Sequence, residues 1–154
     1  MLPFRSSGTR RAPTTVVVCL ALAFALVMTP RAEGASGYRI ITSPDNPTAE
    51  LSRGQAADMF LKHVTTWPDG ERVIPVDLPA ASPVRAAFSE GVLERSVVAQ
   101  KSYWQQQIFS GRGVPPVELD SEEAVVRFVV SHPGAIGYVS DRAELEGAKV
   151  LSLR

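Results

Sequence analysis

The sequence predicts an α/β domain in which helices pack against a largely parallel sheet. Short runs of β-prone residues alternate with longer segments that carry apolar side chains at helical spacing. About 120 residues follow the apolar N-terminal run, which is enough for one hydrophobic core and too few for two. No internal repeat, low-complexity tract or linker divides these residues.

The N-terminal segment has the order of a secretory signal peptide. Three arginines precede the apolar run Val16–Met28, whose 13 residues span about 20 Å of helix, short of the roughly 30 Å of a bilayer core. Ala32 and Gly34 then supply the small residues of a cleavage site. We predict a signal peptide at 1–34 and a mature domain at 35–154, periplasmic or secreted. Cleavage after Ala32 and an uncleaved N-terminal anchor are the alternatives.

Five short runs of β-prone residues predict strands, and turn-forming residues separate them from the segments that follow. The strands are expected at residues 38–42, 72–78, 117–119, 135–139 and 149–153. Pro75 lies inside the second run. Because proline cannot donate a hydrogen bond to a neighbouring strand, we expect an edge position or a bulge there. A short helical turn is expected from Arg142 to Leu145.

Four segments predict helices, and each follows a serine whose hydroxyl can cap the first turn. These serines are Ser52, Ser82, Ser96 and Ser121. The first helix is expected to extend to about His63, the third to stop at Gly111 and the fourth at Pro133. The second start is the clearest, because Pro83 occupies the first helical position, where its missing N–H costs nothing.

Composition argues against nucleic-acid binding and thiol chemistry. The first 34 residues hold four of the 16 basic and one of the 16 acidic residues, so the mature part carries a net charge of −3. A weakly acidic domain without a basic run offers no electrostatic footprint for nucleic acid. The only cysteine, Cys19, lies within the apolar run, so the mature part has no disulfide, no thiol nucleophile and no thiolate metal site.

The sequence contains no motif of a hydrolase, metalloprotease, nucleotide-binding loop or dinucleotide-binding fold. His63 and His132 are isolated and give no metal-ligand spacing. We therefore predict a protein that is not an enzyme and that carries no metal or cofactor. Trp67, Trp104 and Tyr138 either line a ligand cleft or pack in the core, and packing is the commoner role of such residues.

One helix start has the chemistry of an anion site. A helix that begins at Pro83 presents unpaired N–H groups and the positive end of its dipole where the preceding strand ends. The hydroxyl of Ser82 can add a hydrogen bond and Arg85 can add charge, so Ser82, Val84 and Arg85 are the candidate ligand-binding residues. In the alternative interpretation Ser82 only caps its own helix and Arg85 faces solvent.

Several segments, taken in order, resemble phosphate-type periplasmic substrate-binding proteins. The sequence SRGQAADMFL at 52–61 and the turn WPDG at 67–70 resemble a helix and turn of that family. The sequences IPVD at 74–77 and SPVR at 82–85 resemble the strand and helix start of its anion-binding loop. The match continues with Tyr103-Trp104, FSGRG at 109–113, Pro115-Pro116 and PGAIGYV at 133–139, which is the most specific piece.

The resemblance implies a single lobe of a type II periplasmic-binding-protein fold, in a receptor that delivers phosphate or a related oxyanion to an ABC-type importer. The family's loop has an arginine, a short spacer and then Gly-Ser-Gly-Thr, of which Ser82 matches the serine. Leu78 stands where the arginine would be, Ala81 replaces a glycine, and Pro83 and Val84 replace Gly-Thr. A charge-assisted donor, an N–H group and a hydroxyl are thereby lost. Since a full receptor of this family is about twice this length, the resemblance leads us to expect that the family's first lobe is largely absent.

Two functions follow from these residues. The first is an extracytoplasmic solute-binding protein that holds phosphate or a related oxyanion weakly at the helix start after the 73–78 strand and is linked to ABC-type import. The second is an interaction or scaffold protein that binds no ligand and docks on a membrane transporter or another envelope protein. We expect the first, and no nucleic-acid partner in either case.

Overall fold

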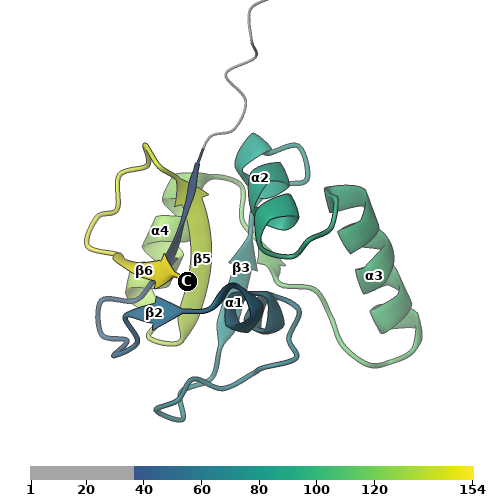
Figure 1. Ribbon diagram of the computed structural model, residues 1–154, viewed down its shortest axis with the longest axis horizontal. Coiled ribbons are helices and arrows are strands. Elements are labelled where there is room, and N and C mark those ends of the chain that lie inside the picture. Colours follow the sequence, from purple (N-terminus) through teal and green to yellow (C-terminus); the bar gives the residue numbers. More distant parts are fainter. Residues whose placement is uncertain (1–36) are drawn as a thin grey trace, which may run out of the picture. The chain divides into compact units, whose positions relative to one another are not determined.

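The computed structural model describes residues 37–154 (Figure 1). The strands are β1 (Tyr38–Thr42), β2 (Glu50–Leu51), β3 (Ile74–Asp77), β4 (Val117–Glu118), β5 (Ala135–Ser140) and β6 (Lys149–Leu153). The helices are α1 (Arg53–Phe60), α2 (Pro83–Gly91), α3 (Val97–Phe109) and α4 (Glu122–Ser131). Within this part of the chain, none of the helices combines the length and the apolar character that a membrane span requires. The predicted signal peptide lies outside the described residues.

The strands form one mixed sheet in the order β2-β6-β1-β5-β3-β4. β3 runs parallel to both of its neighbours, β5 and β4, and β2 runs parallel to β6. β1 is antiparallel to β5 and to β6. Parallel pairings therefore outnumber antiparallel ones, and helices flank the sheet, which confirms the α/β fold with a largely parallel sheet that the sequence predicts.

Two consecutive residues of β5 show that helices cover both faces of the sheet. Successive side chains of a strand point to opposite faces. Gly137 faces α4, where a Cβ added to it would meet Val125 and Val129. The ring of Tyr138 stacks instead on Phe88 of α2, with centroids 3.9 Å apart and an interplanar angle of 6°. α4 thus covers one face, and α2 the other.

Each helix begins one residue after the serine that the sequence predicts as its cap. The serine Oγ accepts a hydrogen bond from the backbone N–H three residues on, at 3.2 Å in α1, 3.3 Å in α2, 3.2 Å in α3 and 3.2 Å in α4. The first helix ends at Phe60, earlier than predicted, because Leu61 closes it and Lys62 turns the chain with a φ of 58°.

The large aromatic side chains pack inside the protein. Trp67, Trp104 and Tyr138 are 2%, 5% and 1% exposed. The indole N–H of Trp67 donates a 3.0 Å hydrogen bond to the carbonyl of Gly134, which joins the turn after α1 to the start of β5. Of the two roles that the sequence left open, the structure supports packing for Trp67 and Tyr138, whereas Trp104 is buried and also lines a cavity.

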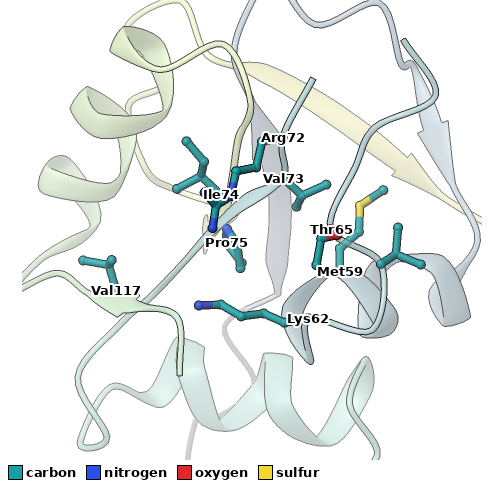
Figure 2. Close-up of a pocket in the computed structure, with 9 residues that line it drawn as sticks. Met59, Lys62, Thr65, Arg72, Val73, Ile74, Pro75 and Val117 are labelled. Atoms are coloured by element: carbon teal, nitrogen blue, oxygen red, sulfur yellow. The ribbon is translucent and has the colours of Figure 1, made fainter. Parts of the chain in front are cut away.

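β3 lies inside the sheet, although Pro75 predicted an edge strand or a bulge. Its outer neighbour, β4, has only two residues and pairs with Val76 and Asp77 alone. At Pro75, therefore, no strand covers the outer side of β3 (Figure 2). Because proline has no N–H, this uncovered position leaves no backbone donor unpaired. Pro75 marks the place where the sheet edge is open, one residue before β4 begins to cover it.

Two short segments differ from the sequence prediction. β2 has two residues, too few for a periodic pattern, and it pairs with the end of β6. The predicted helical turn from Arg142 to Leu145 is an irregular connection with turns at either end. Neither difference changes the layers of the fold.

We expect Gly137→Ala to destabilise the protein by about 1–3 kcal/mol, the usual cost of overpacking a core. The added Cβ would lie 2.7 Å from Val125 Cγ1 and 2.9 Å from Val76 Cγ2. Urea denaturation followed by circular dichroism measures the free energy of unfolding. Gly113→Ala is the matched control, because a Cβ there meets no atom within 4 Å. Equal effects of the two substitutions would contradict the packing described here.

Candidate functional site

The start of α2 lies where two parallel strands end. β3 ends at Asp77 and β4 ends at Glu118, and the two residues are paired in the sheet register. After Asp77 the chain turns sharply, with the Ser82 N–H donating to the carbonyl of Pro79 at 2.8 Å. The carboxyl ends of parallel strands are the usual position of ligand sites in open α/β sheets. The predicted anion site therefore lies in the expected part of the fold.

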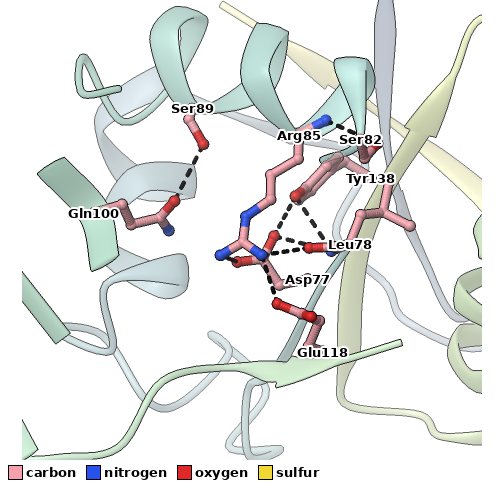
Figure 3. Close-up of polar contacts among 8 residues, drawn as sticks. All are labelled: Asp77, Leu78, Ser82, Arg85, Ser89, Gln100, Glu118 and Tyr138. Carbon is pink, nitrogen blue, oxygen red and sulfur yellow. Dashed lines mark hydrogen bonds and ion pairs between the residues drawn. The ribbon is translucent and has the colours of Figure 1, made fainter. Parts of the chain in front are cut away.

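Arg85 points back from α2 toward the ends of these strands (Figure 3). Its Nη2 lies 2.9 Å from Asp77 Oδ2, and its Nη1 lies 2.7 Å from Glu118 Oε2. Nη1 also donates to the carbonyl of Leu78. The residue is only 8% exposed, so the alternative in which Arg85 faces solvent is wrong. The guanidinium is buried and holds α2 against both strand ends.

Asp77 is the buried partner in this network, and its carboxylate accepts hydrogen bonds from three groups. Oδ1 accepts from the Tyr138 hydroxyl and, at 3.0 Å, from the Leu78 N–H, while Oδ2 pairs with Arg85. Burial raises the pKa of the Asp77 carboxyl above its ordinary value, and the Tyr138 hydroxyl and the Arg85 charge oppose that rise. Burial and the neighbouring Asp77 charge also raise the pKa of Tyr138.

A cluster of three aromatic rings holds Tyr138 in position. The rings of Tyr138, Phe88 and Phe60 contact one another, with centroids 3.9 Å apart for Tyr138 and Phe88, 4.6 Å for Phe88 and Phe60, and 5.7 Å for Phe60 and Tyr138. All three side chains are almost fully buried. The network around Asp77 is thus supported from β5, α2 and α1, and its donors are fixed by packing as well as by hydrogen bonds.

The three residues that the sequence proposed as ligand-binding occupy different environments. Ser82 Oγ accepts from the Arg85 N–H, so the hydroxyl caps its helix as the alternative interpretation stated. The Val84 side chain is 3% exposed and packs in the core, but its N–H finds no acceptor among residues 37–154. Arg85 forms the ion pairs described above. Of the three, Arg85 alone lines the cavity described below.

The sequence did not single out Asp77 and Glu118 as members of this site, and it offered Tyr138 only as a residue that lines a ligand cleft or packs in the core. A usable signal was present for the two acids, since each is the last residue but one of a predicted strand, 72–78 or 117–119, in a sheet predicted to be largely parallel. Parallel strands bring such residues to one edge. Tyr138 carried no comparable signal, because its hydroxyl reaches Asp77 across 61 residues of sequence.

A cavity of about 670 Å³ opens beside the ion-pair network. The network contributes Asp77, Arg85 and Glu118 to its lining, and α3 contributes Val97, Val98, Lys101, Trp104, Gln105 and Ile108. Its volume is within the range of small-molecule sites. In the described part of the chain, no group of three or more His, Cys, Asp or Glu side chains is arranged to hold a metal ion.

Comparisons with known proteins identify the fold. A phosphate transport receptor of the ABC type from Vibrio cholerae is 17% identical with a TM-score of 0.59, over 76% of this chain and 46% of the receptor. A putative phosphate ABC transporter substrate-binding protein from Clostridium perfringens, solved with bound phosphate, is 21% identical with a TM-score of 0.60, over 76% and 44%. No family model and no curated protein matches the sequence.

These structures have the periplasmic-binding-protein fold, and the described chain shares it. The fold that the sequence resemblance implied is therefore confirmed. The chain spans less than half the length of either protein. At these sequence identities the comparison concerns the fold alone, so the ligand has to be argued from the residues of this chain.

We expect Asp77→Asn to destabilise the protein by about 3 kcal/mol, because it leaves the buried Arg85 with an uncharged neighbour at its main contact. Glu118→Gln should cost about 1 kcal/mol or less, since the Glu118 side chain is 55% exposed and its pair with Arg85 is screened by water. Guanidinium denaturation at pH 7 compares the two variants. A larger loss for Glu118→Gln would contradict this ranking.

Proposed function

We propose that this protein is an extracytoplasmic solute-binding protein that holds phosphate or a related oxyanion weakly at the start of α2, in connection with ABC-type import. The observation that carries the proposal is the position of the Arg85 guanidinium, at the carboxyl ends of β3 and β4 and on the wall of the 670 Å³ cavity. The periplasmic-binding-protein fold and the similarity to receptors of phosphate support the class of ligand.

Weak binding follows from the charges around Arg85. Asp77 and Glu118 already place two carboxylates on this one guanidinium. An incoming oxyanion has to displace one of them or accept the repulsion of both. Glu118 is the carboxylate that can leave, because its side chain is half-exposed whereas that of Asp77 is 5% exposed. The Val84 N–H, at the positive end of the α2 dipole, would add a backbone donor.

The leading test is calorimetry of the protein recovered from cells that express the full chain, with phosphate, sulfate and molybdate at millimolar concentration. We expect Glu118→Gln to raise the affinity for the oxyanion about fivefold, because it releases Arg85 Nη1 from a competing acceptor worth about 1 kcal/mol. Glu123→Gln is the matched control, since it removes an exposed carboxylate from α4 on the other face of the sheet.

The absence of heat from any of the three anions, with a folded protein, would rule out oxyanion binding at this site. An equal rise in affinity for Glu118→Gln and Glu123→Gln would show that only the overall charge matters. In either case Arg85 would have a structural role alone.

A second candidate function, an interaction or scaffold protein that binds no ligand, is favoured by a different observation. Val98 and Phe109 are 75% and 92% exposed, and they lie three turns apart on one side of α3. Ile108, beside Phe109, is 52% exposed. Recovery of a transporter or another envelope protein with the wild type, and its loss with Phe109→Ser, would support this candidate.

A further inference from the structure

The open edge of β3 adjoins a second cavity, on a part of the fold that the proposed oxyanion site does not use. This cavity has a volume of about 330 Å³. It is lined by Met59, Lys62, Val64, Thr65, Arg72, Val73, Ile74, Pro75 and Val117. Ile74 and Pro75 belong to the portion of β3 that β4 leaves uncovered. The short β4 and the proline together create this space.

Two cations and no acid line the cavity. Lys62 and Arg72 are its charged residues, and neither forms an ion pair with another residue between 37 and 154. Burial, and then the charge of Arg72, lower the pKa of Lys62. The second effect indicates electrostatic repulsion between the two cations. Two like charges that share a cavity without a counter-charge are mutually unfavourable, and an anion between them would relieve this.

A hydrogen bond holds Lys62 in the lining of the cavity. Its Nζ donates a 3.0 Å hydrogen bond to the carbonyl of Pro115, on the segment that leads into β4. Figure 2 shows its side chain extending toward Val117. An ammonium group has three N–H donors, so two remain for a ligand. Thr65 adds a hydroxyl to the same lining.

The rest of the lining is apolar, and this sets the class of ligand. Met59, Val73, Ile74 and Val117 offer aliphatic surface beside the two cations. A bare inorganic ion would leave that surface in contact with water, whereas an anion with a small apolar group would cover it. We propose that this cavity binds a small amphipathic anion, a phosphate monoester or carboxylate whose charged end meets Lys62 and Arg72 and whose apolar end lies against β3.

This second site is independent of the proposed function. Its residues come from the end of α1, the turn before β3 and the open edge of the sheet, and none belongs to the Asp77–Arg85–Glu118 network. The two cavities also differ in charge, because two acids, Asp77 and Glu118, line the first together with Arg85 and Lys101, whereas only bases line the second. Each can therefore bind or fail to bind without the other.

The test uses phenyl phosphate as the amphipathic probe, inorganic phosphate as the charge alone and phenol as the apolar group alone. Titrations followed by calorimetry and by backbone amide chemical shifts are made on protein recovered from cells expressing the full chain. We expect phenyl phosphate to bind about tenfold more tightly than either fragment. The shifts specific to phenyl phosphate should centre on residues 62–65, 72–74 and Val117, whereas any shifts at residues 82–85 should also appear with inorganic phosphate.

Lys62→Gln and Arg72→Gln should each weaken phenyl phosphate binding about tenfold, the effect of losing one charged donor. Arg127→Gln is the matched control, since it removes an exposed cation from α4 and should leave binding unchanged. Circular dichroism checks that all three variants fold. Arg72 is exposed and Lys62 half-buried, so neither substitution disturbs the core.

Three outcomes would overturn the inference: no amide shifts at the second cavity with millimolar phenyl phosphate, shifts confined to residues 82–85, or equal weakening by all three substitutions. Glu118→Gln separates the two sites, because it should alter phosphate binding at Arg85 and leave phenyl phosphate binding at Lys62 and Arg72 unchanged. Failure at one site is therefore distinguishable from failure at the other.

Discussion

The buried ion pair between Arg85 and Asp77 is the interaction on which the arrangement of the site depends. It joins the first turn of α2 to the last residue of β3, at a distance of 2.9 Å and almost out of contact with water. Removing two charges from water is costly, and attraction between them offsets the cost only when their remaining hydrogen-bonding capacity is met. Leu78 and Tyr138 meet it for the carboxylate, and Glu118 contributes a further acceptor for the guanidinium. The path of the chain from β3 into α2 is fixed by these contacts.

The layers of this fold followed from local signals, which is why the sequence predicted most of them. Each helix start is a serine whose hydroxyl satisfies an N–H three residues away, so the information lies within four residues. The longer strands are marked by β-prone runs in the same way. β2 carries no such signal, since it is two residues long and exists only because β6 lies beside it.

Pro75 was interpreted correctly as a residue without a strand partner on one side, but the conclusion that β3 is an edge strand was wrong. The length of β4 decides that point, and the sequence does not fix it.

The site was harder to predict than the fold because its decisive contacts join distant residues. The helix start at Ser82 and Pro83 was correct, and so was the position of Arg85 in its first turn. The orientation of Arg85 depends on Asp77 and Glu118, which are 8 and 33 residues away in the sequence. The local sequence of a helix predicts the dipole and the unpaired amides at its N-terminus. It does not predict whether an arginine in the first turn is free to bind a ligand or is paired with residues of other elements. Here the sheet supplies the acids that engage it.

The balance of charge differs between the two cavities, and this difference has a structural cause. At the carboxyl ends of β3 and β4 the parallel register brings Asp77 and Glu118 together, so Arg85 is neutralised by the fold itself. At the opposite end of the same strand pair, β4 has not yet begun, and no strand brings an acid to Lys62 and Arg72. The N-terminus of a helix such as α2 favours anions through its dipole and its unpaired amides, which together amount to a fraction of a positive charge. Each nearby carboxylate carries a full negative charge and outweighs that fraction. The electrostatic preference for an anion is therefore weakened at the start of α2, where the fold class predicts it, and is greater at the uncovered edge of β3, whose lining holds cations without acids.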